Sequence, residues 1–356
     1  MRKKGLLMAT AVMASMALMA CGSGSSGTAT TAADARKTEA VATEKAEESK
    51  DAPTADEQKF SLKLAENQSK DNPVSVGVQK FADLVKEKTN GSVEIEVYLD
   101  GTLGTENETI DQVQAGTLDF ARINTSALSS TADEVGVFTL PYIFTSTEQK
   151  YKVLDGEIGQ RISDSLEKYN MISLGYWEAG SRNFYTTKKP ITCVADMKGM
   201  KIRVQQSDIA IKMIETLGAA ATPMSYNEVY QGLQTGVIDG AENDFVSYYT
   251  SGHYEVAKYF SMDGHMAPPA MLIMSKTVWD KMSENQQNAI QEAAKEAREW
   301  QRQAMQDYQE ESRKAVEEKG CEVIDVDVKE FQDAVAPMYD DYPQYKDVIE
   351  QIRSIE

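Results

Sequence analysis

Alternating apolar and polar residues predict the first regular elements of the chain. Residues 60–65 alternate in the way that suits a half-buried strand, and residues 93–99 repeat the alternation. Between them, the apolar positions of residues 78–85 fall on one face of a helix that the pair Asn90-Gly91 ends. The order strand, helix, strand predicts a βαβ unit, a largely parallel sheet and an α/β fold.

One short pattern occurs twice and predicts two units of the same design. Residues 114–121 and 234–241 both read Q-x-G-x-x-D-x-A. In each, we expect a helix to end at the glycine and a strand to follow, although so short a pattern can recur by chance. If the units correspond, Asn124 and Asn243 lie near the carboxyl ends of matching strands, where open α/β sheets bind ligands.

The longest helical pattern lies near the C-terminus. Ser283 to Gln286 forms a capping box, and no proline or glycine interrupts the pattern before Lys319. Such a helix is roughly 50 Å long, which is more than one small lobe needs, so it is predicted to cross two lobes. A coiled coil is the alternative, but the apolar positions from Ile290 to Ala304 do not keep a strict heptad.

The N-terminus has the features of an export signal. Basic residues 2–4 precede an apolar run, residues 5–20, that is too short to span a membrane. Ala20 before Cys21 resembles the lipobox of bacterial lipoproteins, although Met19 is bulkier than usual there. We therefore predict export, with lipid attachment at Cys21 and a location on the outer face of the cytoplasmic membrane or in the periplasm. A free thiol or a disulfide at Cys21 is the alternative.

Composition separates a tether from the folded part. Residues 21–57 contain no aromatic and almost no large aliphatic residue, so they cannot bury enough apolar surface to fold. The following residues, about 300 of them, are more naturally two lobes than one. The formal net charge of −19 makes nucleic acid and anionic lipid poor partners. An anionic ligand is still allowed, because the few charges of a cleft govern what it binds.

The sequence offers no catalytic motif. A P-loop, a G-x-S-x-G elbow and an H-E-x-x-H motif are absent, and His253 and His265 have no cysteine or carboxylate at metal-ligand spacing. We therefore expect a protein that is not an enzyme, without catalytic residue, metal or cofactor, and interpret both histidines as structural. A disulfide between Cys193 and Cys321 is left open.

Residues 198–204 have the shape of a turn followed by a short strand, which would deliver Arg203 to the strand end. A guanidinium held there can bind a carboxylate through two parallel hydrogen bonds, a geometry that lysine cannot reproduce. Taken alone, an arginine is more often a surface residue than a ligand clamp.

Several segments together resemble one family. They are similar in order and spacing to the solute receptors of tripartite ATP-independent periplasmic (TRAP) transporters, the C4-dicarboxylate-receptor (DctP-type) family. The segments are residues 198–204, 222–230 and 233–243, with 91–104, 114–119 and 140–142. The resemblance implies a two-lobed periplasmic-binding-protein-like α/β fold, a ligand cleft between the lobes, and separate membrane permease subunits driven by a sodium gradient. It covers nearly all of the chain from Phe60 onward.

The resemblance also implies an order of parts along the chain, with hinges near residues 176–181 and 265–271. We expect a monomer whose parts are a lipoprotein signal peptide at 1–20, a flexible tether at 21–57, the first part of lobe I at 58–179, the first part of lobe II at 180–268, the return to lobe I with the long helix at 269–308, and the C-terminal part of lobe II at 309–356.

The same matching implies roles in the cleft for particular residues. Arg203 matches the arginine that binds the ligand carboxylate, and Arg182 is a second cation. The other matched contacts are an amide, an aromatic wall and a residue after the first strand: Asn243, Tyr226 and Asn67. The family often has proline after the asparagine that matches Asn243, whereas this chain has Asp244, which leaves the contacts of that loop open.

The candidate residues also bear on the ligand. A dicarboxylate needs two cationic pockets, whereas a sugar acid needs one arginine clamp and groups that both donate and accept hydrogen bonds. The amides that fit a sugar acid are Asn67, Gln68, Asn124, Gln206 and Asn243. Arg122 and Arg182 are the residues that would supply a second cationic pocket. The segments around these residues are similar to family members that bind hexuronates, so the predicted ligand is a hexuronate such as glucuronate or galacturonate, with a C4-dicarboxylate as the alternative.

Other interpretations stay open for single residues and for the protein. Tyr226 would also suit a core, Arg122 a surface ion pair, and Asn67 and Asn124 turns. An extracellular hydrolase or lyase acting on acidic sugars is the rival of another class, and it needs a general base or a metal. A purely structural surface lipoprotein is the third option.

Overall fold

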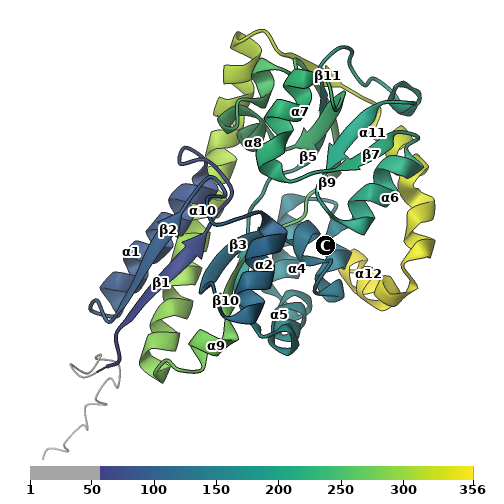
Figure 1. Cartoon of the computed structure of the whole chain (residues 1–356). Coiled ribbons are helices and arrows are strands. Elements are labelled where there is room, and N and C mark those ends of the chain that lie inside the picture. Colours follow the sequence, from purple (N-terminus) through teal and green to yellow (C-terminus); the bar gives the residue numbers. More distant parts are fainter. Residues whose placement is uncertain (1–56, 356) are drawn as a thin grey trace, which may run out of the picture. The chain divides into compact units, whose positions relative to one another are not determined.

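The strand β1 (Phe60–Ala65) is present where the alternation predicts it, and it belongs to the first of two sheets (Figure 1). The computed structural model describes residues 57–355, so the predicted signal peptide, Cys21 and most of the predicted tether lie outside the described residues. Lobe I is built on a five-stranded sheet in the order β2 (Val93–Tyr98), β1, β3 (Phe120–Asn124), β10 (Ala270–Ser275) and β4 (Met171–Trp177). Lobe II is built on a six-stranded sheet in the order β11 (Glu322–Asp325), β9 (Tyr259–Met266), β5 (Arg182–Thr186), β8 (Gly240–Asn243), β6 (Lys201–Val204) and β7 (Ala220–Pro223).

Helices connect the strands and cover the sheets. The α-helices are α1 (Pro73–Lys88), α2 (Glu106–Ala115), α3 (Thr125–Leu128), α4 (Thr147–Asp155), α5 (Glu157–Asp164), α6 (Asp208–Thr216), α7 (Val229–Thr235), α8 (Phe245–Thr250), α9 (Lys276–Trp279), α10 (Glu284–Glu318), α11 (Val328–Val335) and α12 (Lys346–Arg353). The 3₁₀ helices are η1 (Asp133–Thr139), η2 (Ser165–Tyr169), η3 (Val194–Met197), η4 (Tyr226–Glu228), η5 (His253–Glu255), η6 (Ala336–Asp341) and η7 (Pro343–Tyr345).

Both sheets are mixed rather than largely parallel. β1 is parallel to β2 and β3, and β6 is parallel to β7 and β8, as βαβ connections require. β10 is antiparallel to β3 and β4, and β5 is antiparallel to β8 and β9. β5 and β10 are the strands that the chain forms directly after it passes from one sheet to the other. Each therefore runs antiparallel to the strands of the neighbouring βαβ units. The pattern of apolar and polar residues within a strand does not reveal this direction.

The repeated pattern forms the same structure in each lobe. α2 ends before Gly116 and α7 ends before Gly236, and both glycines are left-handed, with φ of 76° and 73°. β3 and β8 follow. Asp119 accepts a backbone N–H of β1 at 2.7 Å, and Asp239 accepts one of β6 at 3.0 Å. The prediction of two units of the same design is confirmed.

The lobes are joined by short crossings and by the long helix. Residues 178–181 lead from β4 to β5, and residues 267–269 lead from β9 to β10. α10 begins at the capping box of Ser283 and Gln286, as predicted. It packs against α1 and β4 of lobe I and against α8 of lobe II, and it passes both sheets in Figure 1. The helix therefore crosses both lobes.

The C-terminal segment contacts both lobes. α11 packs against β9 and α6, whereas α12 packs against α5. Phe331 and Ile352 belong to one buried apolar cluster that also contains Ile123 of β3 and Ile202 of β6. The domain boundaries given above, including the assignment of residues 309–356 to lobe II, stay predictions.

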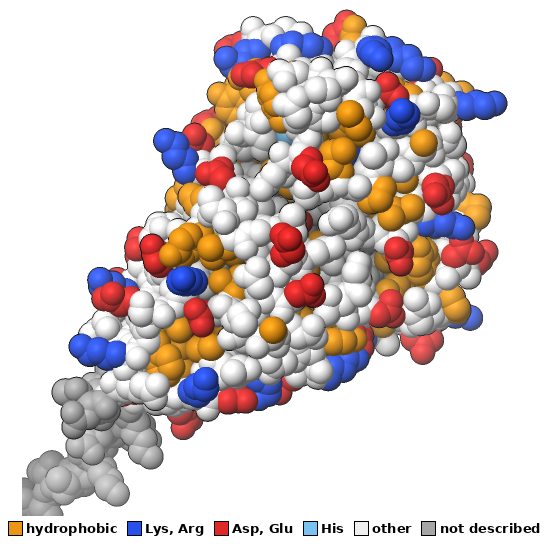
Figure 2. All heavy atoms as spheres, in the orientation of Figure 1, with side chains coloured by type: hydrophobic (Ala, Val, Ile, Leu, Met, Phe, Trp, Pro, Cys, Tyr) orange, Lys and Arg blue, Asp and Glu red, His pale blue; other side chains and the backbone are white. Residues whose placement is uncertain are grey.

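The surface carries charge of both signs. Figure 2 shows Lys, Arg, Asp and Glu side chains interspersed over the face drawn. Within residues 57–355, no helix is both long and apolar enough to cross a membrane. Cys193 and Cys321 are both free, and the thiol of the buried Cys321 lies 3.6 Å from the backbone oxygen of Tyr254.

Candidate functional site

The predicted ligand-binding residues all line two adjoining cavities between the lobes. Residues at or after the carboxyl ends of β1 and β3 approach from lobe I, and residues of β5, β6, β8 and η4 approach from lobe II. The structure brings together Asn67, Arg122 and Asn124 of lobe I with Arg182, Arg203, Gln206, Tyr226 and Asn243 of lobe II. This edge of the sheets is where the strand ends meet, as the paired units predict.

The lobes touch across the mouth of this cleft. Asn107 donates to the side-chain oxygen of Gln206 at 3.2 Å, and Ser130 donates to the backbone oxygen of Gln206 at 3.3 Å. Asn72 donates to the hydroxyl of Thr250 at 3.3 Å. The two cavities have volumes of about 20 Å³ each, which is room for a water molecule. A larger solute therefore enters only when the lobes move apart.

Arg122 is neutralised within lobe I. Its Nε donates to Glu66 Oε2 at 2.6 Å, and its Nη2 contacts Glu66 Oε1 and donates to Asn67 Oδ1 at 2.6 Å. Burial opposes the charge of Arg122, but the attraction of Glu66 outweighs it and raises the pKa of the guanidinium. Because its oxygen is engaged, Asn67 has its Nδ2 group left as a donor for a ligand.

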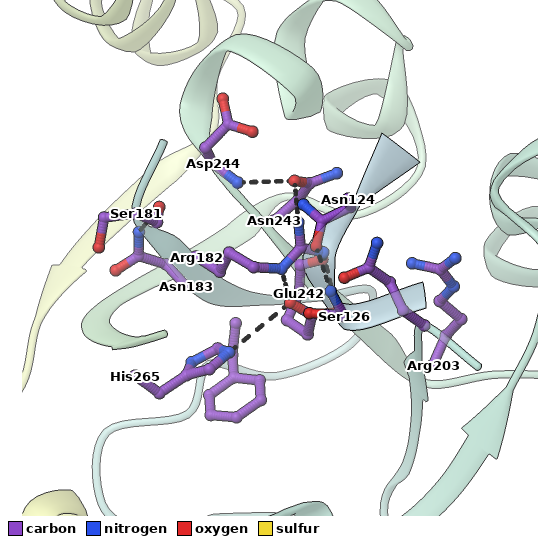
Figure 3. A network of polar contacts seen from close by, with 12 residues as sticks. Asn124, Ser126, Ser181, Arg182, Asn183, Arg203, Glu242, Asn243, Asp244 and His265 are labelled. Carbon is purple, nitrogen blue, oxygen red and sulfur yellow. Dashed lines mark hydrogen bonds and ion pairs between the residues drawn. The ribbon is translucent and has the colours of Figure 1, made fainter. Parts of the chain in front are cut away.

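Arg182 is neutralised in the same way within lobe II (Figure 3). Its Nη2 donates to Glu242 Oε1 at 2.9 Å, its Nε contacts Glu242 Oε2, and its Nη1 donates to Asn243 Oδ1 at 2.9 Å. Burial raises the pKa of Glu242, but Arg182 and His265 together hold it down at about 2. The second cation expected in the cleft is therefore present there but already paired, and the Asn243 amide is oriented like that of Asn67.

The partners of these arginines were missed in the sequence. Glu66 directly precedes Asn67, and Glu242 directly precedes Asn243. A Glu-Asn pair thus follows β1 in lobe I and ends β8 in lobe II, and an arginine from a neighbouring strand binds both side chains. The repeated dipeptide was a visible signal, but nothing in it says which arginine comes to it.

Arg203 differs from the other arginines of the cleft. Within residues 57–355 it has no carboxylate within salt-bridge distance; its Nε and Nη2 donate to the backbone oxygen of Met224 at 3.0 and 2.7 Å. Its guanidinium carbon lies 5.9 Å from the ring centre of Tyr226. Burial lowers the pKa of Arg203, yet a guanidinium stays charged at neutral pH. Figure 3 shows it apart from the network around Arg182. This is the chemistry of a site for one carboxylate.

Glu106 and Gln205 also line the cleft and were not predicted. Glu106 begins α2, where an acidic residue is common, so its position carries no signal of a site. Its Oε1 accepts the N–H of Asn124 at 2.9 Å, and its Oε2 accepts from Gln205 at 3.4 Å. A carboxylate in this position accepts hydrogen bonds from hydroxyl groups and repels a second carboxylate.

The histidines are buried behind the cleft. His265 Nδ1 lies 2.7 Å from Asp263 Oδ2, and its Nε2 lies 3.7 Å from Glu242 Oε2. Burial lowers the pKa of His265, but the carboxylates of Asp263 and Glu242 outweigh it and raise the pKa to about 9. Burial lowers the pKa of His253 to about 3, so it is neutral at pH 7.

Asp244 occupies the position where the resemblance suggests proline. Its carboxylate caps α8 by accepting the N–H of Ser247 at 3.0 Å. Its own N–H donates to Asn243 Oδ1 at 3.0 Å, a bond that proline, lacking an N–H, cannot make. The aspartate therefore fixes the Asn243 amide in the cleft.

Two α/β lobes, short crossings between them and a charged, amide-lined cleft at their interface define a solute-binding receptor. Residues 64–345 match the family of bacterial extracellular solute-binding proteins, family 7 (DctP). The chain belongs to this family and is an extracytoplasmic solute receptor of a TRAP transporter, as the resemblance predicts.

Related proteins and solved structures share most of the chain. A solute-binding protein of Chromohalobacter salexigens is 40% identical over 281 residues, which are 79% of this chain and 84% of that protein. The crystal structure of a TRAP periplasmic solute-binding protein from Xanthobacter autotrophicus Py2, with bound β-D-galacturonate, is 40% identical with a TM-score of 0.81, covering 83% of this chain and 100% of the other. A second crystal structure, from Chromohalobacter salexigens with bound D-glucuronate, is 37% identical with a TM-score of 0.81, covering 83% and 100%. These relatives are solute-binding proteins, not enzymes.

Proposed function

We propose that this receptor binds a hexuronate, D-galacturonate or D-glucuronate, and delivers it to the membrane permease of its transporter. The observation that carries the proposal is the state of the cleft arginines. Arg122 and Arg182 are paired with glutamates, whereas Arg203 has no anionic partner among residues 57–355. One free guanidinium among amides suits a ligand with one carboxylate and several hydroxyl groups. The related structures with bound galacturonate and glucuronate support the same class.

The roles of the residues follow from their free groups. Arg203 binds the carboxylate through its remaining N–H groups. The Nδ2 groups of Asn67 and Asn243 donate to ligand oxygens, because their Oδ1 atoms are held by arginines. Glu106 accepts from hydroxyl groups, and the ring of Tyr226 packs against the sugar. Asn124 and Gln206 lie where they complete the wall of the cleft.

The same groups argue against a C4-dicarboxylate. Its second carboxylate requires a second free cation, but Arg122 and Arg182 are each bound to a buried glutamate. Glu106 lies 3.9 Å from Arg122 and adds a negative charge on the side of the cleft in lobe I. Glu66 and Glu106 together outnumber Arg122 in charge, so the second carboxylate of a dianion would be repelled on this side of the cleft.

Calorimetry with D-galacturonate, D-glucuronate, succinate and L-malate tests the proposal. We expect saturable binding of at least one uronate and at least 100-fold weaker binding of both dicarboxylates, an order of magnitude set by about 3 kcal/mol for an unpaired buried charge. Tighter binding of either dicarboxylate than of both uronates would overturn it.

We further propose that the protein returns its ligand unchanged. The buried carboxylates Glu66 and Glu242 are held by arginines and are poor general bases. Proton NMR of a free uronate and of an oligouronate, each incubated with a tenth of its concentration of pure protein, is expected to show both sugars unaltered after a day. A hydrolase or lyase would produce new signals.

The proposal places the receptor on the outer face of the cytoplasmic membrane as a monomer. Lipid attachment at Cys21 is supported by the lipobox-like residues before it in the sequence.

A further inference from the structure

A larger cavity lies on the other side of the crossings from the ligand cleft. Its volume is about 510 Å³, against about 20 Å³ for each cavity of the cleft. Residues 142–147 and Lys150 line it from lobe I, and Val328 and Gln332 of α11 line it from the side of lobe II. Its remaining walls come from the two crossings, β5 and β9, and from α10: Glu178, Gly180, Ser181, Asn183, Met262, Asp263, Gly264, Met266, Ala267, Met305, Gln306 and Gln309. We call this cavity the hinge groove.

The crossing from β4 to β5 separates the hinge groove from the cleft. Ala179 and Arg182 line the cleft, whereas Glu178, Gly180 and Ser181 line the groove. Met305 of α10 is common to both linings. The cleft and the groove therefore share a thin partition made of the crossing itself.

The crossing is held in place at Glu178. Its N–H donates to Gln301 at 3.0 Å, and Gln301 donates back to the Glu178 backbone oxygen at 2.8 Å. Lys150 donates to the Glu178 carboxylate at 2.6 Å. The crossing is therefore a fixed partition between the two spaces. When the lobes rotate about it, the hinge groove widens as the ligand cleft narrows. The volumes agree with this relation, because the narrow cleft faces a wide groove.

We propose that the hinge groove controls the equilibrium between the open and closed cleft, so that a group filling the groove favours the closed receptor and tightens ligand binding without touching the ligand. Opening the cleft requires residues 142–150 and α11 to approach each other across the groove. A bulky side chain between them opposes that approach sterically. The readout in ligand affinity rests on the proposed function, whereas the readout in molecular dimensions does not.

Two side chains allow the groove to be filled from two of the helices that line it. Gln309 is on α10 and Gln332 is on α11; the first is half-buried, the second is exposed, and both line the groove. Gln309→Trp and Gln332→Trp add volume inside the groove without removing an apolar core residue. Gln291→Trp is the matched control, because Gln291 is an exposed residue of α10 outside the groove lining.

The variants are compared with the wild-type protein by small-angle scattering without ligand and by calorimetry with D-galacturonate. Both groove variants are expected to have a smaller radius of gyration than the unliganded wild type, and a Kd about 3- to 10-fold lower, since the binding-competent closed state starts at a lower free energy. Gln291→Trp is expected to match the wild type in both. Folded groove variants with unchanged dimensions, or with larger dimensions and weaker binding, would overturn the proposal. If the wild type binds no uronate, the proposed ligand is wrong, and the scattering comparison still decides the role of the groove.

Discussion

At the scale of single residues, the ligand that the cleft can bind depends on which of its charged side chains already have a partner of opposite charge. Arg203 is 3% exposed and donates only to the Met224 backbone oxygen in the described part of the chain, so its charge is desolvated without an anion. A carboxylate ligand removes this deficiency, and the net gain of a charged hydrogen-bonded pair is larger than that of a neutral one. The unpaired charge of Arg203 therefore accounts for the proposed preference for a ligand with one carboxylate.

Replacement of Arg203 tests this argument. Arg203→Ala is expected to weaken uronate binding by about 2–5 kcal/mol, because the ligand carboxylate is left buried and unpaired. Arg203→Lys is expected to be costly as well, since one ammonium group cannot form the two parallel bonds. Arg313→Ala, at an exposed arginine of α10 outside the cleft, serves as the control in the same titration calorimetry. If Arg203→Ala bound the uronate with near wild-type affinity, the assignment of Arg203 to the ligand carboxylate would be wrong.

The buried histidines make stability depend on pH in opposite directions. The pKa of His265 is raised from 6.5 to about 9, so its contribution is complete below pH 6.5 and is lost as the pH rises through 9. The pKa of His253 is lowered from 6.5 to about 3, so its contribution is present above pH 6.5 and is lost as the pH falls toward 3. Stability is therefore expected to decline on both sides of about pH 6.5.

The alkaline side is the more specific test. From pH 6.5 to 9.5 the loss attributable to His265 is expected to approach about 3 kcal/mol in the free energy of unfolding, and His265→Gln is expected to flatten that part of the profile. Urea unfolding of both proteins across this range measures the difference. Parallel profiles for the two proteins would contradict the ion pairs assigned to His265.

At the scale of elements, the crossing and α8 pack closely at one glycine. Gly180 is in the left-handed region with φ of +77°, and a Cβ added there would lie 2.4 Å from the Asp244 Cβ. Asp244 caps α8 and binds Asn243, so the crossing, the helix start and a cleft amide are held together. Such a contact leaves no room for a side chain.

Gly180→Ala is expected to destabilise the fold by about 2–4 kcal/mol, because backbone strain and a steric clash act together, and to weaken ligand binding as Asn243 is displaced. Gly199→Ala is the matched control: its φ is +78°, but nothing lies within 4 Å of an added Cβ. It is expected to cost about 1 kcal/mol without a change in Kd. Equal effects of the two substitutions on stability and Kd would refute the packing argument.

At the scale of the whole molecule, the lobes are held across the cleft by weak direct contacts. The hydrogen bonds of Gln206 and Thr250 across the mouth measure 3.2 to 3.3 Å and involve neutral side chains. A ligand that binds Arg203 on one lobe and Asn67 on the other adds contacts that exist only when the cleft is closed. The ligand therefore shifts the population toward closure.

Small-angle scattering with and without saturating uronate measures this shift. The radius of gyration is expected to fall when the ligand binds, because the lobes approach each other about the crossings. Full occupancy by calorimetry with an unchanged scattering profile would mean that the cleft is preformed and rigid.

Anchoring also belongs to this scale. Cys21→Ser is expected to remove the site of lipid attachment, so the exported protein appears in the soluble fraction while the wild type stays with the membrane. Fractionation followed by a high-salt wash checks this, and binding of uronate to the released variant shows that the receptor remains folded. A variant that stays membrane-bound after the wash would argue against a lipid anchor.

The sequence by itself determined the features that depend on neighbouring residues. The first βαβ unit, the paired helix-glycine-strand units and the capped helix from Ser283 arise from periodicity, turn glycines and helix caps, which act over a few positions. Matching to the family also selected residues that lie together in the cleft, Arg203 among them. The local units and the candidate residues named from the family match were therefore accessible without a structure, whereas Glu106 and Gln205 were not.

Only the tertiary structure decided the direction of β5 and β10 and the charge state of the cleft. Arg122 binds a glutamate 56 residues away, and Arg182 binds one 60 residues away. Which carboxylate reaches which guanidinium depends on the order of strands in the finished sheets, and no local pattern encodes that order. The sequence showed three arginines suited to an anion, and the packing of the strands leaves only Arg203 without an anionic partner in the described residues, because the other two are neutralised from neighbouring strands.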